Sequence, residues 1–326
     1  MTTAPWPRIG VMGGGAIGCL YGGWLARAGA EVVLVGRPAH VDAIRANGLR
    51  MTGKAFEGTV SLAASIDIAA LASVDLLLFC TKTRDTEATA HQLKPVLPKT
   101  ATVLAFQNGV DGAERISAIL DNPVFPAALI VSCQMAGPGV VQHNGRGEVI
   151  LGEWFAGRSD APARAARLAS VVETLNRAGI PTTQADDIRR TMWTKLAMNC
   201  AYNAISALGR ARYRRLASTD VSVSLMEDVV RELIAVGRAD GVALDFDDVF
   251  PRVMELGDSM AVAISSTGQD IAASRRTEID DLNGFVVRRG RARGVPTPVN
   301  ATLQVLVRIL EEAPVDPAFF PEARKD

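Results

Sequence analysis

The stretch Gly13-Gly14-Gly15-Ala16-Ile17-Gly18 directly follows an apolar run, Ile9-Gly10-Val11-Met12, near the start of the chain. The order of strand, G-x-G-x-x-G loop and helix predicts a dinucleotide-binding turn. Gly13 permits the tight turn, Gly15 lets the backbone approach a pyrophosphate, and Gly18 brings the helix close to the strand. Free N–H groups at the start of the helix would face the phosphates. We therefore expect dinucleotide contacts from Gly13, Gly14, Gly15, Ala16, Ile17 and Gly18.

The residues after this loop complete a βαβ unit. A helix predicted over 19–27 ends at a glycine, and a second strand follows over 31–35. Units that bind NAD usually carry an acidic residue at the end of that strand, where it binds the ribose 2′-hydroxyl. This chain has Gly36-Arg37 instead, and an arginine can pair with a 2′-phosphate through two parallel hydrogen bonds. The sequence thus favours NADP(H) over NAD(H), with Arg37 as a contact; the alternative is a solvated loop arginine.

Composition narrows the class of protein. The chain has 326 residues, 48% of them hydrophobic, and this length favours two domains over one. Lysine plus arginine equals aspartate plus glutamate at 35 each, so no net field attracts nucleic acid or anionic lipid. We expect a small-molecule partner, no nucleic acid and no membrane, with a homodimer as the candidate assembly. The short polar N-terminus and the lack of a long apolar run predict a soluble, cytoplasmic protein.

Cysteines and histidines are scattered through the chain. The four cysteines form no C-x-x-C pair, and His40, His91 and His143 do not cluster with them. We therefore expect neither structural zinc, nor a disulfide framework, nor a metal in the active site.

The first half of the chain continues to alternate strands with helices. Apolar runs over 75–80 and 102–107 predict buried parallel strands, each followed by a helix. Lys82 follows the first strand and Asn108 the second, at the carboxyl ends that line the ligand crevice of an open parallel sheet. Both are candidates for contact with cofactor and substrate. The alternatives are a surface cation and an ordinary Asn-Gly turn.

Residues 125–183 are expected to complete this α/β region. An apolar segment at 125–131 precedes a glycine-rich piece at 137–152, which we predict to be a hairpin. A helix over 161–177 and a short strand over 180–183 close the domain.

From Asp187 onward, strand-like runs give way to long helical periodicities. The predicted fold is α/β plus all-α. An N-terminal Rossmann-type dinucleotide-binding domain is expected over 1–186, and a C-terminal helical substrate and catalytic domain over 187–326.

The predicted helix 192–206 carries Lys195, Asn199 and Asn203 at intervals of four residues, which places them on one stripe. A solvated face is the ordinary explanation. Two asparagines fit it poorly, because Glu, Gln and Lys form helices better. A lysine among apolar neighbours would be partly desolvated, which lowers its pKa and enables it to donate a proton.

Glu278 is a second candidate. We predict that it lies on a helix with Ile279 and Phe285 among the core residues. Its acidic neighbours Asp280 and Asp281 make an exposed carboxylate the ordinary explanation.

Three motifs together resemble the ketopantoate reductase (2-dehydropantoate 2-reductase) family, and they span essentially the whole chain. They are Gly-Gly-Gly-Ala-Ile-Gly-Cys-Leu-Tyr-Gly at 13–22, Trp-Thr-Lys-Leu-Ala-Met-Asn-Cys at 193–200, and Arg-Thr-Glu-Ile-Asp-Asp-Leu-Asn-Gly at 276–284 with Gly-Val-Pro-Thr-Pro-Val-Asn at 294–300. The resemblance implies NADPH-dependent reduction of ketopantoate to pantoate, within pantothenate and coenzyme A biosynthesis.

The resemblance also implies roles for residues. Lys195 matches the catalytic lysine, which stabilises and protonates the oxyanion, and Glu278 matches the catalytic or substrate-orienting glutamate. Substrate-pocket positions are matched by Asn108, Asn199, Asn203 and Ser266, and cofactor contacts by Arg37, Lys82, Asn108 and the glycine loop.

The chain departs from the family pattern beside Ser266. Typical members have asparagine where this chain has Ala263, and often methionine where it has Thr267. This leaves open a paralogous NADP-dependent reductase of another 2-keto acid or of an imine. A non-catalytic NADP-binding sensor is less favoured, because Lys195 and Glu278 are both present.

Overall fold

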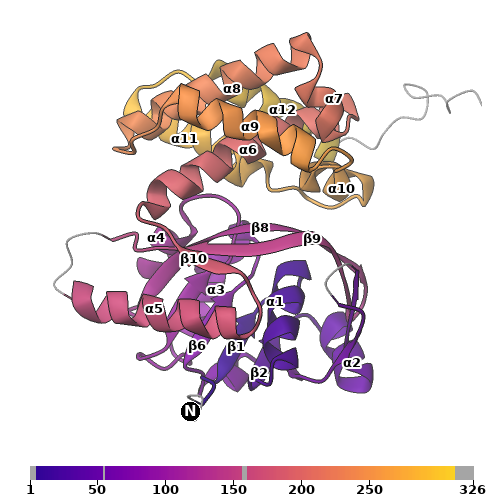
Figure 1. Cartoon of the computed structure of the whole chain (residues 1–326), viewed down its shortest axis with the longest axis vertical. Helices are drawn as coiled ribbons and strands as arrows, with labels where there is room; N and C mark the ends of the chain where they lie inside the picture. The colour runs from indigo at the N-terminus through magenta and orange to yellow at the C-terminus, as the bar shows by residue number, and fades with distance from the viewer. Residues whose placement is uncertain (1–4, 54–55, 156–159, 313–326) are drawn as a thin grey trace, which may run out of the picture. The chain divides into compact units, whose positions relative to one another are not determined.

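The structure is a computed structural model that describes residues 5–53, 56–155 and 160–312. The chain divides into two compact units, Met1–Met192 and Trp193–Asp326, and the division falls inside helix α6 (Ile188–Gly209) (Figure 1). The first unit is α/β and the second is helical. The domain boundary expected after residue 186 stays a prediction.

The first unit is organised around a run of parallel strands. Their bounds are β1 (Ile9–Met12), β2 (Val32–Val35), β5 (Ala63–Ser65), β6 (Leu76–Phe79), β7 (Thr102–Ala105) and β8 (Val124–Gly137). They lie in the order β5-β2-β1-β6-β7-β8. Numbered by their place among these parallel strands, this is the order 3-2-1-4-5-6 of the dinucleotide-binding fold, with the switch point between β1 and β6. The predicted Rossmann-type fold is confirmed.

The sheet continues past β8 through four further strands, one of which, Thr182–Gln184, corresponds to the strand predicted over 180–183. β9 (Val140–Leu151) pairs antiparallel with β8. On its other side it pairs parallel with β3 (Leu49–Gly53) and with β10 (Thr182–Gln184). β4 (Gly58–Val60) pairs antiparallel with β3 and forms the edge of the sheet. The hairpin predicted at 137–152 is present with other bounds, because β8 and β9 pair antiparallel around a turn at residues 138–139 and the first strand precedes the predicted piece. That piece is almost wholly one strand, and Gly147 is an extra residue opposite a register shift in β8, so it supports a bulge and not a turn.

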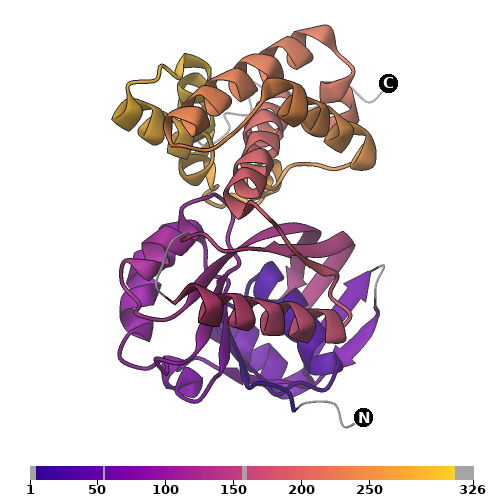
Figure 2. The ribbon, with the colours of Figure 1, turned by 60° about the vertical axis from the view of Figure 1, so that its left-hand side comes forward.

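Helices cover both faces of the parallel strands. Their bounds are α1 (Ala16–Arg27), α2 (Pro38–Asn47), α3 (Thr86–Leu93), α4 (Gly112–Ser117) and α5 (Ala161–Arg177), and η2 (Thr83–Asp85) precedes α3. Alternate residues of β6 enter different cores, because successive side chains of a strand point to opposite faces. Leu76 and Leu78 pack with α1 and α5, whereas Leu77 and Phe79 pack with α3 and α4. Figure 2 shows α5 lying across one face.

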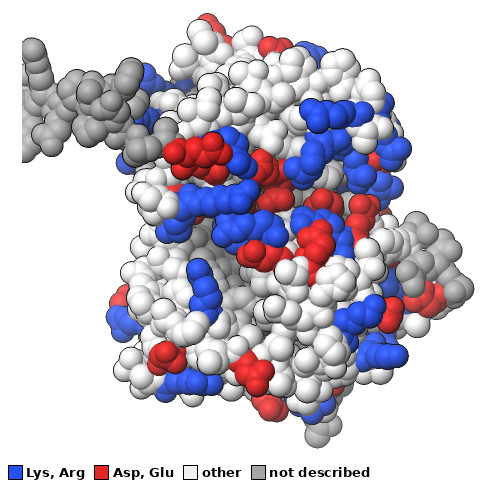
Figure 3. Space-filling model, turned by 180° about the vertical axis from the view of Figure 1, so that it is seen from behind, with Lys and Arg blue, Asp and Glu red and all other residues white. Residues whose placement is uncertain are grey.

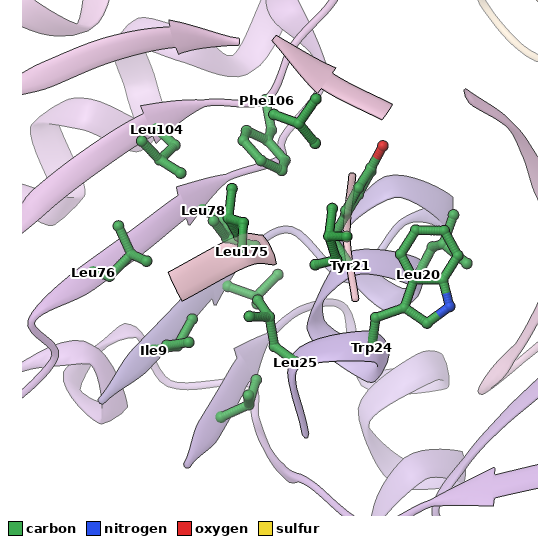
Figure 4. Close-up of a cluster of buried hydrophobic side chains, with 14 of the residues drawn as sticks. Ile9, Leu20, Tyr21, Trp24, Leu25, Leu76, Leu78, Leu104, Phe106 and Leu175 are labelled. Atoms are coloured by element: carbon green, nitrogen blue, oxygen red, sulfur yellow. The ribbon is translucent and has the colours of Figure 1, made fainter. Parts of the chain in front are cut away.

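The core under α1 and α5 fixes the position of the glycine loop. Figure 4 shows Leu25 of α1 and Leu175 of α5 near Leu78 of β6, whereas Leu20 lies on the other side of Tyr21, beside Trp24. The four leucine side chains are fully buried. α1 begins at Ala16, within the glycine loop and three residues earlier than predicted. The packing of α1 therefore also holds the loop in position.

The second unit contains α6 and a set of further helices. Their bounds are α7 (Tyr213–Ala217), α8 (Asp220–Ala239), α9 (Phe246–Ser259), α10 (Ser266–Ala272), α11 (Asn283–Arg293) and α12 (Pro298–Glu312). Trp193 of α6 is buried, meets the ring of Phe285 edge-on at 5.7 Å, and fits against Gly237 of α8. Residues 193–312 contain no strand, which confirms the predicted helical region.

The surface carries charges of both signs. Figure 3 shows basic and acidic side chains intermixed on the face that it presents. Over the described residues, none of the helices combines the length and the apolar character that crossing a bilayer would need.

Candidate active site

The glycine loop occupies the turn between β1 and α1 at the switch point of the sheet. Gly13 has φ +116°, and a Cβ there would lie 2.7 Å from the carbonyl carbon of Cys80. A Cβ on Gly18 would lie 2.0 Å from the Gly13 oxygen, so the helix packs directly on the loop. A Cβ on Gly15 would meet nothing within 4 Å. Close packing thus accounts for Gly13 and Gly18, whereas the space beside Gly15 is open.

The start of α1 suits an anion. Gly15 is the N-cap residue, no side chain caps the helix, and its first turn contains no acidic residue. Free N–H groups at a helix start and the positive end of the helix dipole attract phosphate. The open space at Gly15 and the N–H groups that follow through Ala16 and Ile17 therefore fit a dinucleotide pyrophosphate.

Arg37 lies beside this loop. A Cβ on Gly36 would approach the backbone of Gly14 to 3.2 Å, so the end of β2 packs against the loop. Arg37 follows as the exposed N-cap residue of α2. Its charge adds to burial in lowering the pKa of His40. The position is adjacent to the loop, as a contact to the 2′-phosphate of NADP(H) requires.

Lys82 and Asn108 stand after neighbouring strands, as predicted. Lys82 is exposed at the N-cap of η2, and Asn108 is half-buried after β7. The Thr83 hydroxyl donates to the Asn108 carbonyl oxygen at 3.2 Å, which joins the two segments. The glycine loop, Arg37, Lys82 and Asn108 all belong to the first unit.

Gln107 is a structural residue of this region that the sequence analysis missed. It is 6% exposed, and its Nε2 donates at 3.0 Å both to the Thr81 carbonyl oxygen and to the Thr86 hydroxyl. These bonds fix the loops after β6 and β7 relative to each other. An amide at the end of an otherwise apolar strand was the available signal.

Lys195, Asn199 and Asn203 lie on α6 in the second unit. Asn203 is only 4% exposed, and Lys195 and Asn199 are half-buried, so a solvated face does not describe this stripe. Burial lowers the pKa of Lys195 to about 8, and the charge of Glu278 opposes that shift. The predicted direction of the pKa shift is confirmed. Lys195 and Glu278 are therefore close enough to interact electrostatically.

The prediction that Glu278 lies on a helix is wrong. Glu278 is the N-cap residue of a short 3₁₀ turn, η3 (Ile279–Asp281). The Thr277 hydroxyl accepts the N–H of Ile279 at 3.1 Å, and such a local bond competes with helix formation. Ile279 and Phe285 are buried as expected.

The acidic neighbour Asp280 has partners of its own. Its carboxylate accepts from Gln304 at 2.7 Å and from Arg308 at 2.6 Å. These bonds lower the pKa of Asp280 against the opposing effect of burial. Asp280 is thus engaged in structural bonds, and its presence does not make Glu278 a surface residue.

Ser266 is brought to Asn203. Asn203 Nδ2 donates to Ser266 Oγ at 3.4 Å, across 63 residues of sequence. Ser265 joins the same two elements, because its hydroxyl donates to the Asn203 carbonyl oxygen at 3.0 Å and accepts the N–H of Gly268. The second unit thus assembles Lys195 near Glu278, and Asn203 beside Ser266. Within the described residues, no group of three His, Cys, Asp or Glu side chains could hold a metal.

A nucleotide-binding fold followed by a helical unit with a lysine of lowered pKa is an arrangement suited to a dinucleotide-dependent reductase. Comparison with family models gives the particular family. The model described as ketopantoate reductase PanE/ApbA matches residues 9–155, and the model of the C-terminal part of that family matches residues 187–311. The chain belongs to the ketopantoate reductase family.

Individual relatives cover nearly the whole chain. The 2-dehydropantoate 2-reductase of Halobacterium salinarum is 32% identical over 313 residues, covering 93% of this chain and 99% of that protein. The crystal structure of a PanE/ApbA family ketopantoate reductase from Ralstonia eutropha JMP134 has a TM-score of 0.86 at 43% identity, covering 94% and 98% of the two chains. The ternary structure of D-mandelate dehydrogenase with NADH and anilino(oxo)acetate also has a TM-score of 0.86, at 25% identity and the same coverage.

Proposed function

We propose that the protein reduces 2-dehydropantoate to pantoate with NADPH, as a cytoplasmic step towards pantothenate and coenzyme A. The observation that carries the proposal is Lys195, whose pKa is lowered to about 8 by burial. Full-length similarity to 2-dehydropantoate 2-reductases supports it. In this proposal residues 1–186 hold the cofactor and residues 187–326 hold the substrate and the catalytic groups.

The first unit would hold the cofactor through its backbone. The pyrophosphate would lie against the open side of Gly15 and the start of α1, and Arg37 would pair with the 2′-phosphate. Lys82 and Asn108, after β6 and β7, would line the crevice toward the nicotinamide. When bound, NADPH supplies the hydride that reduces the carbonyl carbon of the substrate.

Lys195 would stabilise the negative charge that develops on the carbonyl oxygen and then donate its proton. With a pKa of about 8 it is mostly protonated at pH 7, yet it releases the proton more readily than an exposed lysine. The charge of Glu278 keeps this pKa from falling further. A preorganised donor of this kind is typically worth about 3 to 4 kcal/mol.

The other polar residues of the second unit would bind substrate. Asn199 and Asn203 would orient it, Ser266 would bind its carboxylate, and Glu278 would accept a hydrogen bond from its distal hydroxyl. A site built around that hydroxyl discriminates against analogues without it, because the glutamate is then left without a partner.

A second candidate is the reduction of a 2-keto acid with a larger apolar group. The loop before Ser266 supports it, since Ala263 lies between Val262, which is 74% exposed, and Ile264, which is 51% exposed. The similarity to D-mandelate dehydrogenase, whose structure was determined with NADH, also supports it and extends the candidate cofactors to NADH.

A steady-state assay of NADPH oxidation distinguishes these candidates. The substrates are 2-dehydropantoate, 2-ketoisovalerate, which lacks its hydroxymethyl group and so its hydroxyl, and the aromatic phenylglyoxylate. We expect the highest kcat/KM for 2-dehydropantoate, and we expect Glu278→Ala to bring the values for 2-dehydropantoate and 2-ketoisovalerate together. Equal turnover of these two by the unaltered protein would refute the assignment, and a preference for phenylglyoxylate would establish the second candidate.

A further inference from the structure

Three polar side chains of the second unit form a chain of hydrogen bonds that ends at Ser266. The Tyr213 hydroxyl and Asn203 Oδ1 lie 3.3 Å apart, and Asn203 Nδ2 and Ser266 Oγ lie 3.4 Å apart. Tyr213 is 7% exposed and Asn203 is 4% exposed, whereas Ser266 is exposed. The chain therefore leads from the interior of the helical unit to a hydroxyl that a ligand can reach.

The direction of donation is fixed at the buried end. The phenol hydrogen of Tyr213 needs an acceptor, and among the described residues Asn203 Oδ1 is the one that it has. If the amide turned over, its NH₂ group would face the phenol and the phenol hydrogen would be left buried without an acceptor, which is costly. Tyr213 thus holds the oxygen of the Asn203 amide inward and its NH₂ group toward Ser266.

This direction determines what Ser266 can bind. Because Ser266 Oγ accepts from Asn203, its own hydrogen is available for donation away from the chain. The site therefore suits a strong hydrogen-bond acceptor, and a carboxylate is a stronger acceptor than a neutral ester. We infer that Tyr213 is a positioning residue that orients Asn203, and through it Ser266, toward the carboxylate of a 2-keto acid. The inference rests on the proposed function and adds a residue to it.

The hydroxyl of Tyr213 can be removed without disturbing the surrounding backbone. The N–H of Tyr213 donates to the Ala263 carbonyl oxygen at 3.3 Å, and Ser265 holds α10 against α6. The Tyr213 ring also contacts the ring of Tyr202, with 4.4 Å between the centroids. None of these contacts uses the Tyr213 hydroxyl, so Tyr213→Phe removes only the first of the hydrogen bonds that lead to Ser266.

Tyr202 provides a matched control. Its ring contacts Tyr213 and is buried, but its hydroxyl lies near the backbone of Gly257 and, within the described residues, makes no hydrogen bond of good geometry. Tyr202→Phe therefore removes a hydroxyl from the same aromatic pair and leaves the hydrogen bonds from Tyr213 to Ser266 intact.

The experiment measures kcat and KM for 2-ketoisovalerate and for its methyl ester, which lacks the negative charge. We expect Tyr213→Phe to raise KM for the acid about 10-fold, the effect of losing one buried hydrogen bond to a charged group, while kcat stays within about twofold. The preference for acid over ester should fall by about the same factor, since the ester depends less on the Ser266 donor. Tyr202→Phe should leave both the KM and the preference unchanged.

Equal losses for acid and ester in Tyr213→Phe would show a merely structural role and overturn the inference, as would an unchanged KM. A second test uses Ser266→Ala, in which Tyr213→Phe should have no further effect on the preference for acid over ester. Additive effects of the two substitutions would overturn the inference. An unaltered protein that reduces no 2-keto acid would refute the proposed function itself, whereas an active protein with an unchanged Tyr213→Phe variant refutes this inference alone.

Discussion

The two units present their candidate functional groups in opposite ways. In the first unit the candidate site consists of backbone N–H groups that face open space. A Cβ on Gly15 would meet nothing within 4 Å, and no side chain caps the start of α1. In the second unit it is made of side chains from separate elements, with Lys195 and Asn203 on α6, Ser266 on α10 and Glu278 before η3. A backbone site suits a cofactor common to many enzymes, whereas a site of side chains can be changed residue by residue to suit a substrate.

The largest expected effect falls on the side-chain site. Lys195→Ala should lower kcat by roughly 10²-fold to 10⁴-fold, because a positioned acid contributes about that much. The dissociation constant of NADPH, measured by fluorescence titration, should stay nearly unchanged. Lys99→Ala, which removes an exposed lysine of the first unit, serves as the control. A folded Lys195→Ala protein that kept most of its kcat would show that Lys195 has no part in the chemistry.

The backbone site predicts a different effect for each of two glycines. Gly15→Ala should raise the dissociation constant of NADPH by about 10-fold to 100-fold, since a methyl group displaces the pyrophosphate from its close approach. Its Tm should stay unchanged, because the new Cβ meets nothing within 4 Å. Gly18→Ala should lower Tm, because its Cβ would lie 2.0 Å from the Gly13 oxygen. Equal losses of Tm in the two variants would contradict this division of roles.

Arg37 adds a side-chain contact to the backbone site. Arg37→Ala should reduce the preference for NADPH over NADH by about 10-fold, the effect of losing one charge-assisted pair. The ratio of kcat/KM for the two cofactors measures it. Arg45→Ala, on the same helix but bonded to the Ala64 carbonyl oxygen, should leave the ratio unchanged. Equal kcat/KM for NADPH and NADH in the unaltered protein would contradict the preference for NADP(H).

The smallest expected effect is a pH dependence. The pKa of Lys195 is lowered from 10.5 to about 8, so kcat for reduction should fall about fourfold between pH 7 and 8.5 as the lysine loses its proton. Stability changes in the opposite sense. The folded protein binds fewer protons at this site than the unfolded chain between pH 8 and 10.5, so the contribution of Lys195 to the free energy of unfolding rises with pH over that window. Lys195→Arg, which stays charged, should remove both changes; a fall in its kcat between pH 7 and 8.5 would assign the titration to another group.

The backbone site could be predicted from sequence because its determinants are local. The glycine spacing and the apolar run before it specify strand, turn and helix within a few residues, and the lack of an acid before Arg37 is equally local. The lowered pKa of Lys195 was also predictable, since its neighbours on α6 are apolar.

The features that were missed depend on hydrogen bonds that the periodicity of the sequence does not reveal, some between elements and one between near neighbours. The sequence placed a whole hairpin within 137–152, whereas the turn lies at residues 138–139 and the rest of the piece is one strand, because β8 pairs along its length. Glu278 precedes a 3₁₀ turn and does not lie on the predicted helix, because the Thr277 hydroxyl accepts a hydrogen bond from the N–H of Ile279. Tyr213 has no local signal, and its importance depends on Asn203, which lies on another helix. Hydrogen bonds between elements cannot be read from periodicity.

The most direct test of the account follows the hydride itself. NADPH with deuterium at both C4 positions is incubated with the protein and 2-dehydropantoate, and the product is examined by NMR and mass spectrometry. The account predicts pantoate with one deuterium on carbon 2, and no such product from the Lys195→Ala protein within the same time. Absence of pantoate with the unaltered protein, or pantoate without deuterium on carbon 2, would contradict the account.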